Sequence, residues 1–315
     1  MRILLSTFIL LVLAILPVSA GAEPLAVSVS IPPQKYFVEK VGGSAVAVTV
    51  MAAKGQDPHT YEPTAAQMEG ITKADLYFTI NVPFEKQWIP KFVSLNPSLN
   101  IVSLADVVDS IQDKPDLALR DTLPGKGLHR HKHHAHGHEH GHGHEGHHHE
   151  AEMDDPHLWL SPADMMRTVP VIVDALGKSR PELAKEFAER GQTLLREIED
   201  LNGKILVLLA PVTNRTFLTF HQSWAYYVRN FNLREASVEL EGRSPGPKSM
   251  AMLIDFARAN AIRVIVADSM TAASAVKAIA QQLGTETVHA NPLAEDWPDA
   301  LLEFSIALAK ALGAR

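Results

Sequence analysis

The sequence predicts an α/β protein with two similar lobes, each built on a four-stranded parallel sheet, joined by one long rigid helix. Two sets of short β-branched runs alternate with helical patterns, one in the first third of the chain and one in the last third. A long helical pattern lies midway between the two sets. Parallel strands need crossover connections, which are usually helices, so this alternation favours sheets that are covered on both faces.

The first 22 residues are predicted to be a cleaved secretory signal. Arg2 precedes an apolar run over 3–17, and small residues follow. The run is shorter than the roughly 20 residues that span a membrane, and cleavage after Ala20 or Ala22 fits the Ala-x-Ala pattern. Because the chain has no cysteine for lipid attachment, we expect a mature protein without a membrane anchor, located in a Gram-negative periplasm.

The first lobe is expected to span 23–180. Helical patterns over 34–41 and 64–73 alternate with its candidate strands, which are 25–30, 46–50, 75–80 and 100–103. A histidine-rich stretch without apolar periodicity interrupts this lobe at 114–153. Its composition predicts an inserted loop.

Residues 181–210 are predicted to form the linking helix. Pro181 suits the first helical turn, and the pattern stops before Pro211. Apolar residues recur every three or four positions, as on one face of a helix: Leu194, Ile198, Leu201, Ile205 and Leu208. At ~1.5 Å per residue such a helix is ~45 Å long, which is enough to run beside both lobes.

The second lobe is expected to span 211–315. Helical patterns over 248–260 and 272–283 alternate with its candidate strands, which are 216–220, 236–240, 264–268 and 286–289. This repeats the organisation of the first lobe.

Charge and composition exclude several classes of function. Lys and Arg total 29 against 36 Asp and Glu, for a net charge of −7, whereas a nucleic-acid-binding protein needs a basic face. The absence of cysteine excludes disulfides, thiolate zinc sites and iron–sulfur clusters. Histidine is unusually abundant, with 16 residues.

Three histidines outside the histidine-rich loop occur in a shared context, beside the ends of predicted strands or the starts of helices. His59 and His157 each follow Asp-Pro, and His221 follows the strand predicted over 216–220. Proline stiffens the turn that presents each of the first two imidazoles. The aspartates of these motifs, Asp57 and Asp155, are expected to accept nearby N–H groups or to orient an imidazole.

Three imidazoles form a site that suits Zn²⁺ best, with Cu²⁺ or Ni²⁺ as alternatives, and that is poor for Mn²⁺, Mg²⁺ or Ca²⁺. Weaker, transient zinc sites are expected in the histidine-rich loop. Its histidines are His129, His131, His133, His134, His136, His138, His140, His142, His144, His147, His148 and His149.

At its three motifs the chain resembles the zinc/manganese family of periplasmic solute-binding proteins of ABC transporters, and most of all its high-affinity zinc-uptake branch. The motifs are Asp-Pro-His-x-Tyr-Glu-Pro at 57–63, Asp-Pro-His-x-Trp-Leu-Ser-Pro at 155–162, and Phe-His-x-Ser-Trp at 220–224. The resemblance implies two lobes with the metal in the cleft between them, ligated by His59, His157 and His221. It also implies a monomer that binds zinc as transported cargo, delivers it to an integral-membrane ABC permease, and is not an enzyme.

The fourth ligand stays open, because Asn291 stands where the family usually has aspartate. Water, Glu62, a histidine of the loop or the Asn291 amide oxygen are the candidates. His289 lies two residues before Asn291 and would point to the same side of a continuing strand, but it is more typical of a structural strand-end histidine.

Two other functions compete with capture of zinc for transport. A zinc hydrolase also uses three ligands and an open water position, with Glu62 as general base, although no helical pattern of the chain carries a His-Glu-x-x-His motif. A zinc-sequestering or adhesion protein would bind the same ion without any transporter.

Overall fold

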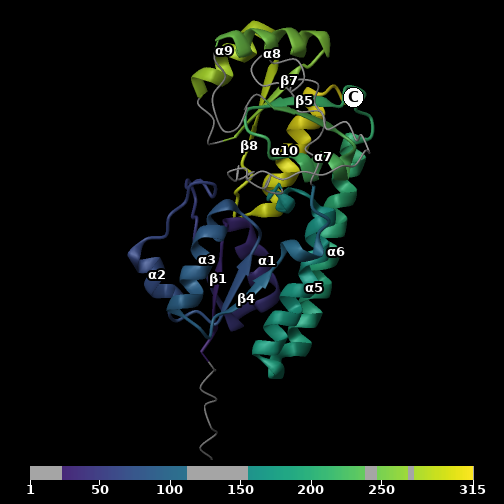
Figure 1. Ribbon diagram of the computed structural model, residues 1–315. Coiled ribbons are helices and arrows are strands. Elements are labelled where there is room, and N and C mark those ends of the chain that lie inside the picture. Colours follow the sequence, from purple (N-terminus) through teal and green to yellow (C-terminus); the bar gives the residue numbers. More distant parts are fainter. Residues whose placement is uncertain (1–22, 112–154, 238–246, 269–272, 315) are drawn as a thin grey trace, which may run out of the picture.

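The computed structural model describes residues 23–111, 155–237, 247–268 and 273–314. The predicted signal peptide and all the histidines of the histidine-rich loop lie outside these residues. The described chain forms two four-stranded sheets with flanking helices, and the predicted fold class is therefore confirmed. Figure 1 shows the two sheets in separate lobes, with a long helix beside them.

The first sheet has the strand order β2-β1-β3-β4, and all its neighbouring strands are parallel. Its strands are β1 (Leu25–Val29), β2 (Val46–Val50), β3 (Leu76–Thr79) and β4 (Asn100–Ser103). Its helices are α1 (Pro32–Gly42), α2 (Ala65–Ile71) and α3 (Pro83–Leu95). β-branched side chains such as Val27 and Val29 in the central β1 are fully buried, as expected for a parallel strand covered on both faces.

The second sheet repeats this topology, with the parallel order β6-β5-β7-β8. Its strands are β5 (Thr216–Thr219), β6 (Arg234–Ser237), β7 (Val264–Asp268) and β8 (Glu286–Ala290). Its helices are α7 (Ala225–Phe231), α8 (Pro247–Ala259), α9 (Ala273–Leu283) and α10 (Trp297–Ala311). The strand predicted over 236–240 begins two residues earlier, because Arg234 already pairs with Thr216 of β5, and its last predicted residues lie outside the described chain.

Two helices pack against each other along one side of the molecule (Figure 1): α5 (Pro162–Ser179) and α6 (Ala184–Leu209), the latter preceded by a 3₁₀ turn over Pro181–Leu183. The helix predicted over 181–210 therefore starts with a tighter turn at its proline. Leu209 is buried and Leu208 only partly so, since a 3.6-residue period drifts around a helix this long. Gly191 permits close packing of the two helices, because a Cβ there would lie 2.5 Å from a methyl group of Val173.

The apolar interior is divided unequally. The larger core joins the first sheet, α5, α6 and α10 with one face of the second sheet. The smaller core includes Leu218, Ile265 and Ala267 of the second sheet, packed with Ala257 of α8 and Ile279 of α9. Figure 1 shows α8 and α9 on the outer side of the second sheet, away from the first lobe.

Within the described ranges, no helix combines the length and the apolar character needed to cross a bilayer.

Candidate metal centre

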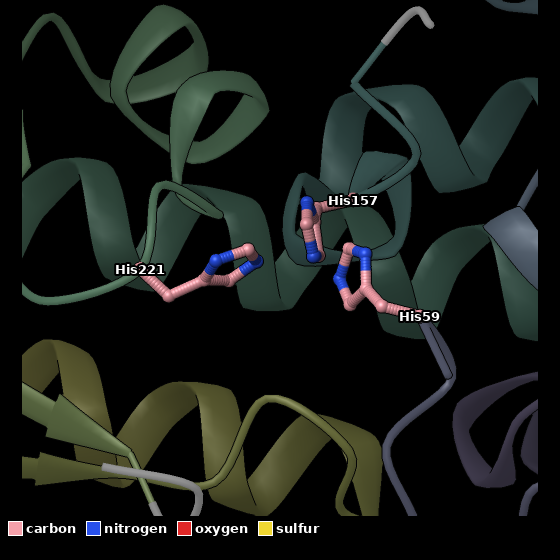
Figure 2. Close-up of side chains that lie close together, drawn as sticks. All are labelled: His59, His157 and His221. Atoms are coloured by element: carbon pink, nitrogen blue, oxygen red, sulfur yellow. The ribbon is translucent and has the colours of Figure 1, made fainter. Parts of the chain in front are cut away.

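The side chains of His59, His157 and His221 converge between the two lobes. Their ring centroids are 4.8 Å apart for His59 and His221, and 5.4 Å apart for each of the other two pairs. One potential ligand atom from each ring lies within 4.8 Å of the others. Figure 2 shows the three rings pointing toward one another from separate segments of the chain.

His59 is presented by a turn that follows β2. The Asp57 carboxylate accepts the backbone N–H of His59 at 2.9 Å and the hydroxyl of Thr60 at 3.3 Å. The segment then enters α2, where the Thr64 hydroxyl caps the helix by accepting the backbone N–H of Gln67. Local backbone chemistry therefore sets the position of this histidine.

His157 is presented by a buried turn before α5. One oxygen of Asp155 accepts the His157 backbone N–H at 2.9 Å and also contacts the ring Nδ1 at 2.7 Å. Residues Leu158–Leu160 form a 3₁₀ turn, and the Ser161 hydroxyl caps α5 by accepting the N–H of Asp164. The Nε2 atom of His157 is therefore the one left for a ligand.

His221 lies two residues after β5, in a loop that a buried carboxylate holds. Glu235 of β6 is fully buried and accepts the Thr219 hydroxyl at 2.8 Å and the backbone N–H groups of Ser223 and Trp224 at 3.1 and 3.0 Å. Burial raises the pKa of Glu235 to about 8. These bonds close the loop around His221, although Glu235 is not among the site residues predicted from the sequence. The only sequence feature that could have pointed to Glu235 is that a charged residue directly precedes the strand predicted over 236–240.

The site disfavours protonation of His59 and favours the ionised form of Asp155. Burial and the neighbouring His157 and His221 together lower the pKa of His59 to about 4. Burial alone would raise the pKa of Asp155, but the charge of His157 and its hydrogen bonds outweigh that effect and lower it. Neutral imidazole is the form that binds a metal ion.

Two tryptophans connect the lobes directly beside His157. The Trp159 indole N–H donates to the Pro292 carbonyl at 2.7 Å, and the Trp297 indole N–H donates to the Trp159 carbonyl at 2.7 Å. The Trp297 ring also packs on Phe37 of α1, with centroids 4.8 Å apart. These contacts hold the segment before α10 against the first lobe.

Glu62, His289 and Asn291 have exposed side chains. Within the described chain, the only set of His, Cys, Asp or Glu side chains able to surround one ion is the histidine trio, which includes neither Glu62 nor His289. The described residues thus bring together His59, His157 and His221 and leave the other two outside that set.

The trio has the dimensions of a nearly formed zinc site. With Zn–N bonds of about 2.0–2.1 Å, tetrahedral geometry places ligand nitrogens roughly 3.3 Å apart. The ligand atoms here lie within 4.8 Å, so side-chain movements of about 1 Å would bring them onto one ion. Three neutral nitrogen ligands favour a borderline-soft divalent cation over Mg²⁺ or Ca²⁺.

Comparisons with known proteins agree with this architecture. The family model described as zinc-uptake complex component A, periplasmic, matches residues 27–311. A zinc-binding lipoprotein, AdcA, of Streptococcus pneumoniae is 26% identical over 271 residues, which are 83% of this chain and 48% of that protein. A putative metal-binding protein of Chlamydia muridarum is 24% identical, over 90% of each chain. The chain spans about half the length of the streptococcal relatives that it matches.

Solved structures match over nearly the whole chain. A crystal structure of ZnuA superposes with a TM-score of 0.77 at 29% identity, covering 92% of this chain and 100% of the other. A zinc-bound ZnuA deletion mutant gives 0.76 at 29% identity, covering 93% and 99%. A manganese-bound periplasmic protein of Candidatus Liberibacter asiaticus, at 18% identity, shares the fold with a TM-score of 0.72, covering 91% and 99%. Because the family model spans most of the sequence, this chain belongs to the family of periplasmic A components of zinc-uptake complexes.

Proposed function

We propose that this protein captures Zn²⁺ between its lobes and delivers it to an ABC permease for import. The observation that carries the proposal is the convergence of His59, His157 and His221 from both lobes, with ligand atoms within 4.8 Å of one another. These three histidines would be the ligands. The family to which the chain belongs, and relatives named as zinc-binding or solved with zinc bound, support zinc as the cargo.

The ligand set favours zinc over manganese. All three ligands are imidazole nitrogens, and Mn²⁺ prefers carboxylate and water oxygens. A competition experiment with equimolar Zn²⁺ and Mn²⁺ is therefore expected to load zinc. Preferential manganese loading would contradict the assignment.

Water is proposed as the fourth ligand. Glu62, His289 and Asn291 are exposed, and an exposed side chain would have to lose its hydration to reach the trio. X-ray absorption at the zinc edge should then report three nitrogens and one oxygen, unchanged by Asn291→Ala or Glu62→Ala. Loss of the oxygen in either variant would assign it to that side chain.

The proposed setting is the periplasm, reached through the signal predicted over 1–22, with the mature chain acting as an unanchored monomer. The histidine-rich loop at 114–153 would add weaker zinc sites that buffer the supply. Deleting this loop is expected to remove the weaker binding and to leave one tight zinc per chain. Loss of the tight zinc in the deletion variant would place a ligand within the loop.

The decisive experiment is a zinc titration of chelator-stripped protein. The wild type should bind one tight zinc per chain, and the triple variant His59→Ala, His157→Ala and His221→Ala should lose it. His289→Ala is the matched control, because it removes an exposed histidine outside the trio. A triple variant that keeps the tight zinc would refute the proposed site.

The proposal also says that the protein is not an enzyme and not merely a zinc store. Turnover of ester or peptide substrates that depends on zinc would favour a hydrolase, since a three-ligand zinc with open water is also a catalytic arrangement. Restoration of zinc uptake in low-zinc medium by the wild type, and not by the triple variant, would distinguish import from sequestration or adhesion.

A further inference from the structure

We propose that Asp155 is a positioning residue that makes His157 the anchoring ligand of the site, whereas Asp57, its counterpart in the first motif, only shapes the backbone turn. The inference deepens the proposed zinc capture and rests on it. It starts from two Asp-Pro-His motifs, 57–59 and 155–157, that are identical in sequence and different in structure.

The two aspartates share one contact. Asp57 accepts the backbone N–H of His59 at 2.9 Å, and Asp155 accepts the backbone N–H of His157 at 2.9 Å. Each contact bends the chain in the same way and presents the histidine from a proline-stiffened turn. As far as the backbone is concerned, the motifs are equivalent.

The contacts of the two carboxylates with the rings differ. The Asp155 oxygen lies 2.7 Å from Nδ1 of His157, and both side chains are almost completely buried, with 4% and 7% exposed. A carboxylate can only accept, so Nδ1 must carry the proton and Nε2 must present its lone pair. A buried charge-assisted bond of this length also restricts rotation of the ring.

Asp57 gives its ring no such support. Its second oxygen accepts the Thr60 hydroxyl at 3.3 Å, and the His59 ring has the other two imidazoles as its neighbours. Among the described residues, no carboxylate is hydrogen-bonded to the His59 ring. His157 is thus oriented before any ion arrives, whereas His59 becomes oriented by binding one.

The charge of Asp155 adds to its effect on His157. Three neutral imidazoles leave the two positive charges of the ion uncompensated in a partly buried cleft, which costs free energy. The side chain of Asp155 is buried directly behind His157, so its negative charge acts on the ion through that ring. The ion is therefore expected to bind most strongly to His157.

The test compares Asp155→Ala with Asp57→Ala in the full-length protein. Both variants lose the same backbone contact at 2.9 Å. Asp57→Ala also loses the contact with the Thr60 hydroxyl, whereas only Asp155→Ala loses a ring contact and a carboxylate buried behind a ligand. Zinc affinity is measured by competition with a chelator. The tautomer of His157 is measured by ¹⁵N NMR of the zinc-free protein, with the resonance assigned through His157→Gln.

We expect Asp155→Ala to weaken zinc binding about 10- to 100-fold and Asp57→Ala by no more than about threefold. His157 should carry its proton on Nδ1 in the wild type and in Asp57→Ala, and should become a mixture of tautomers in Asp155→Ala. Equal losses of affinity in the two variants, or an unchanged tautomer in Asp155→Ala, would overturn the inference. A wild type that binds no zinc, yet shows this tautomer change, would refute the proposed function and leave the Asp155 contact supported.

Discussion

Replacing His59 by glutamine should make the zinc-free protein less sensitive to acid. The pKa of His59 is lowered from 6.5 to about 4 by burial and by its two neighbouring histidines. Between these pH values the unfolded chain binds a proton that the folded chain does not. The stabilising contribution of neutral His59 is therefore complete above pH 6.5 and is lost as the pH falls toward 4.

The expected size of this effect follows from the shift. A difference of one pKa unit corresponds to 1.36 kcal/mol, so a shift from 6.5 to about 4 corresponds to about 3 kcal/mol of unfolding free energy. Over that pH range the wild type should lose about 3 kcal/mol more than His59→Gln. The loss is a cost of keeping His59 neutral beside two other imidazoles in the absence of metal.

Urea unfolding of chelator-stripped protein measures it, with the free energy of unfolding determined at intervals from pH 7.5 to pH 4. His289→Gln serves as the control, because it removes an exposed histidine outside the cluster. Parallel stability curves for the wild type and His59→Gln would refute the reasoning. Such a result would mean that the folded protein accommodates a protonated His59 without penalty.

Three further predictions concern stability. The pKa of Glu85 is raised to about 7 by burial, so its contribution to stability is complete below pH 4.5 and declines as the pH rises through about 7. Glu85→Gln should remove about 3 kcal/mol of that decline in unfolding experiments. An unchanged dependence of the unfolding free energy on pH would contradict the assignment. Trp297→Phe removes the donor to the Trp159 carbonyl and should lower the free energy of unfolding by about 1–3 kcal/mol, measured by urea unfolding; an unchanged value would mean that this contact between the lobes adds nothing. Zinc at 100 times its Kd should stabilise the wild type by about 2.7 kcal/mol. Calorimetry should show a raised Tm that a chelator reverses. A Tm that does not respond to zinc would contradict specific binding to the folded state.

Much of the fold follows from local pattern. The strand boundaries of β2, β4 and β7 coincide with the predictions, because each strand is a short run that contains β-branched residues. The long helix was predictable from apolar spacing. The start of β6 was missed, because Arg234 and Glu235 are charged and only the tertiary contacts of Glu235 make its burial acceptable.

The three histidines of the candidate site could be predicted from the sequence, but the groups that contact them could not. Motif context identified three histidines that the structure brings together, although they lie about a hundred and about sixty residues apart in the chain. The different roles of Asp57 and Asp155 could not be predicted, since their local sequences are the same and only tertiary packing decides which carboxylate contacts a ring. The contacts of Trp159 with the segment before α10 are likewise long-range.

The unequal division of the apolar interior has a consequence for how the molecule can be cut or recombined. Because the larger core runs through α5, α6 and α10 into one face of the second sheet, a gene fragment encoding either lobe alone would express a protein with part of this shared core exposed to water. The outer layer of α8 and α9 has a small core of its own. Exchange of segments between distant relatives is therefore best tolerated in that layer. In such chimeras the two lobes should come from the same parent protein.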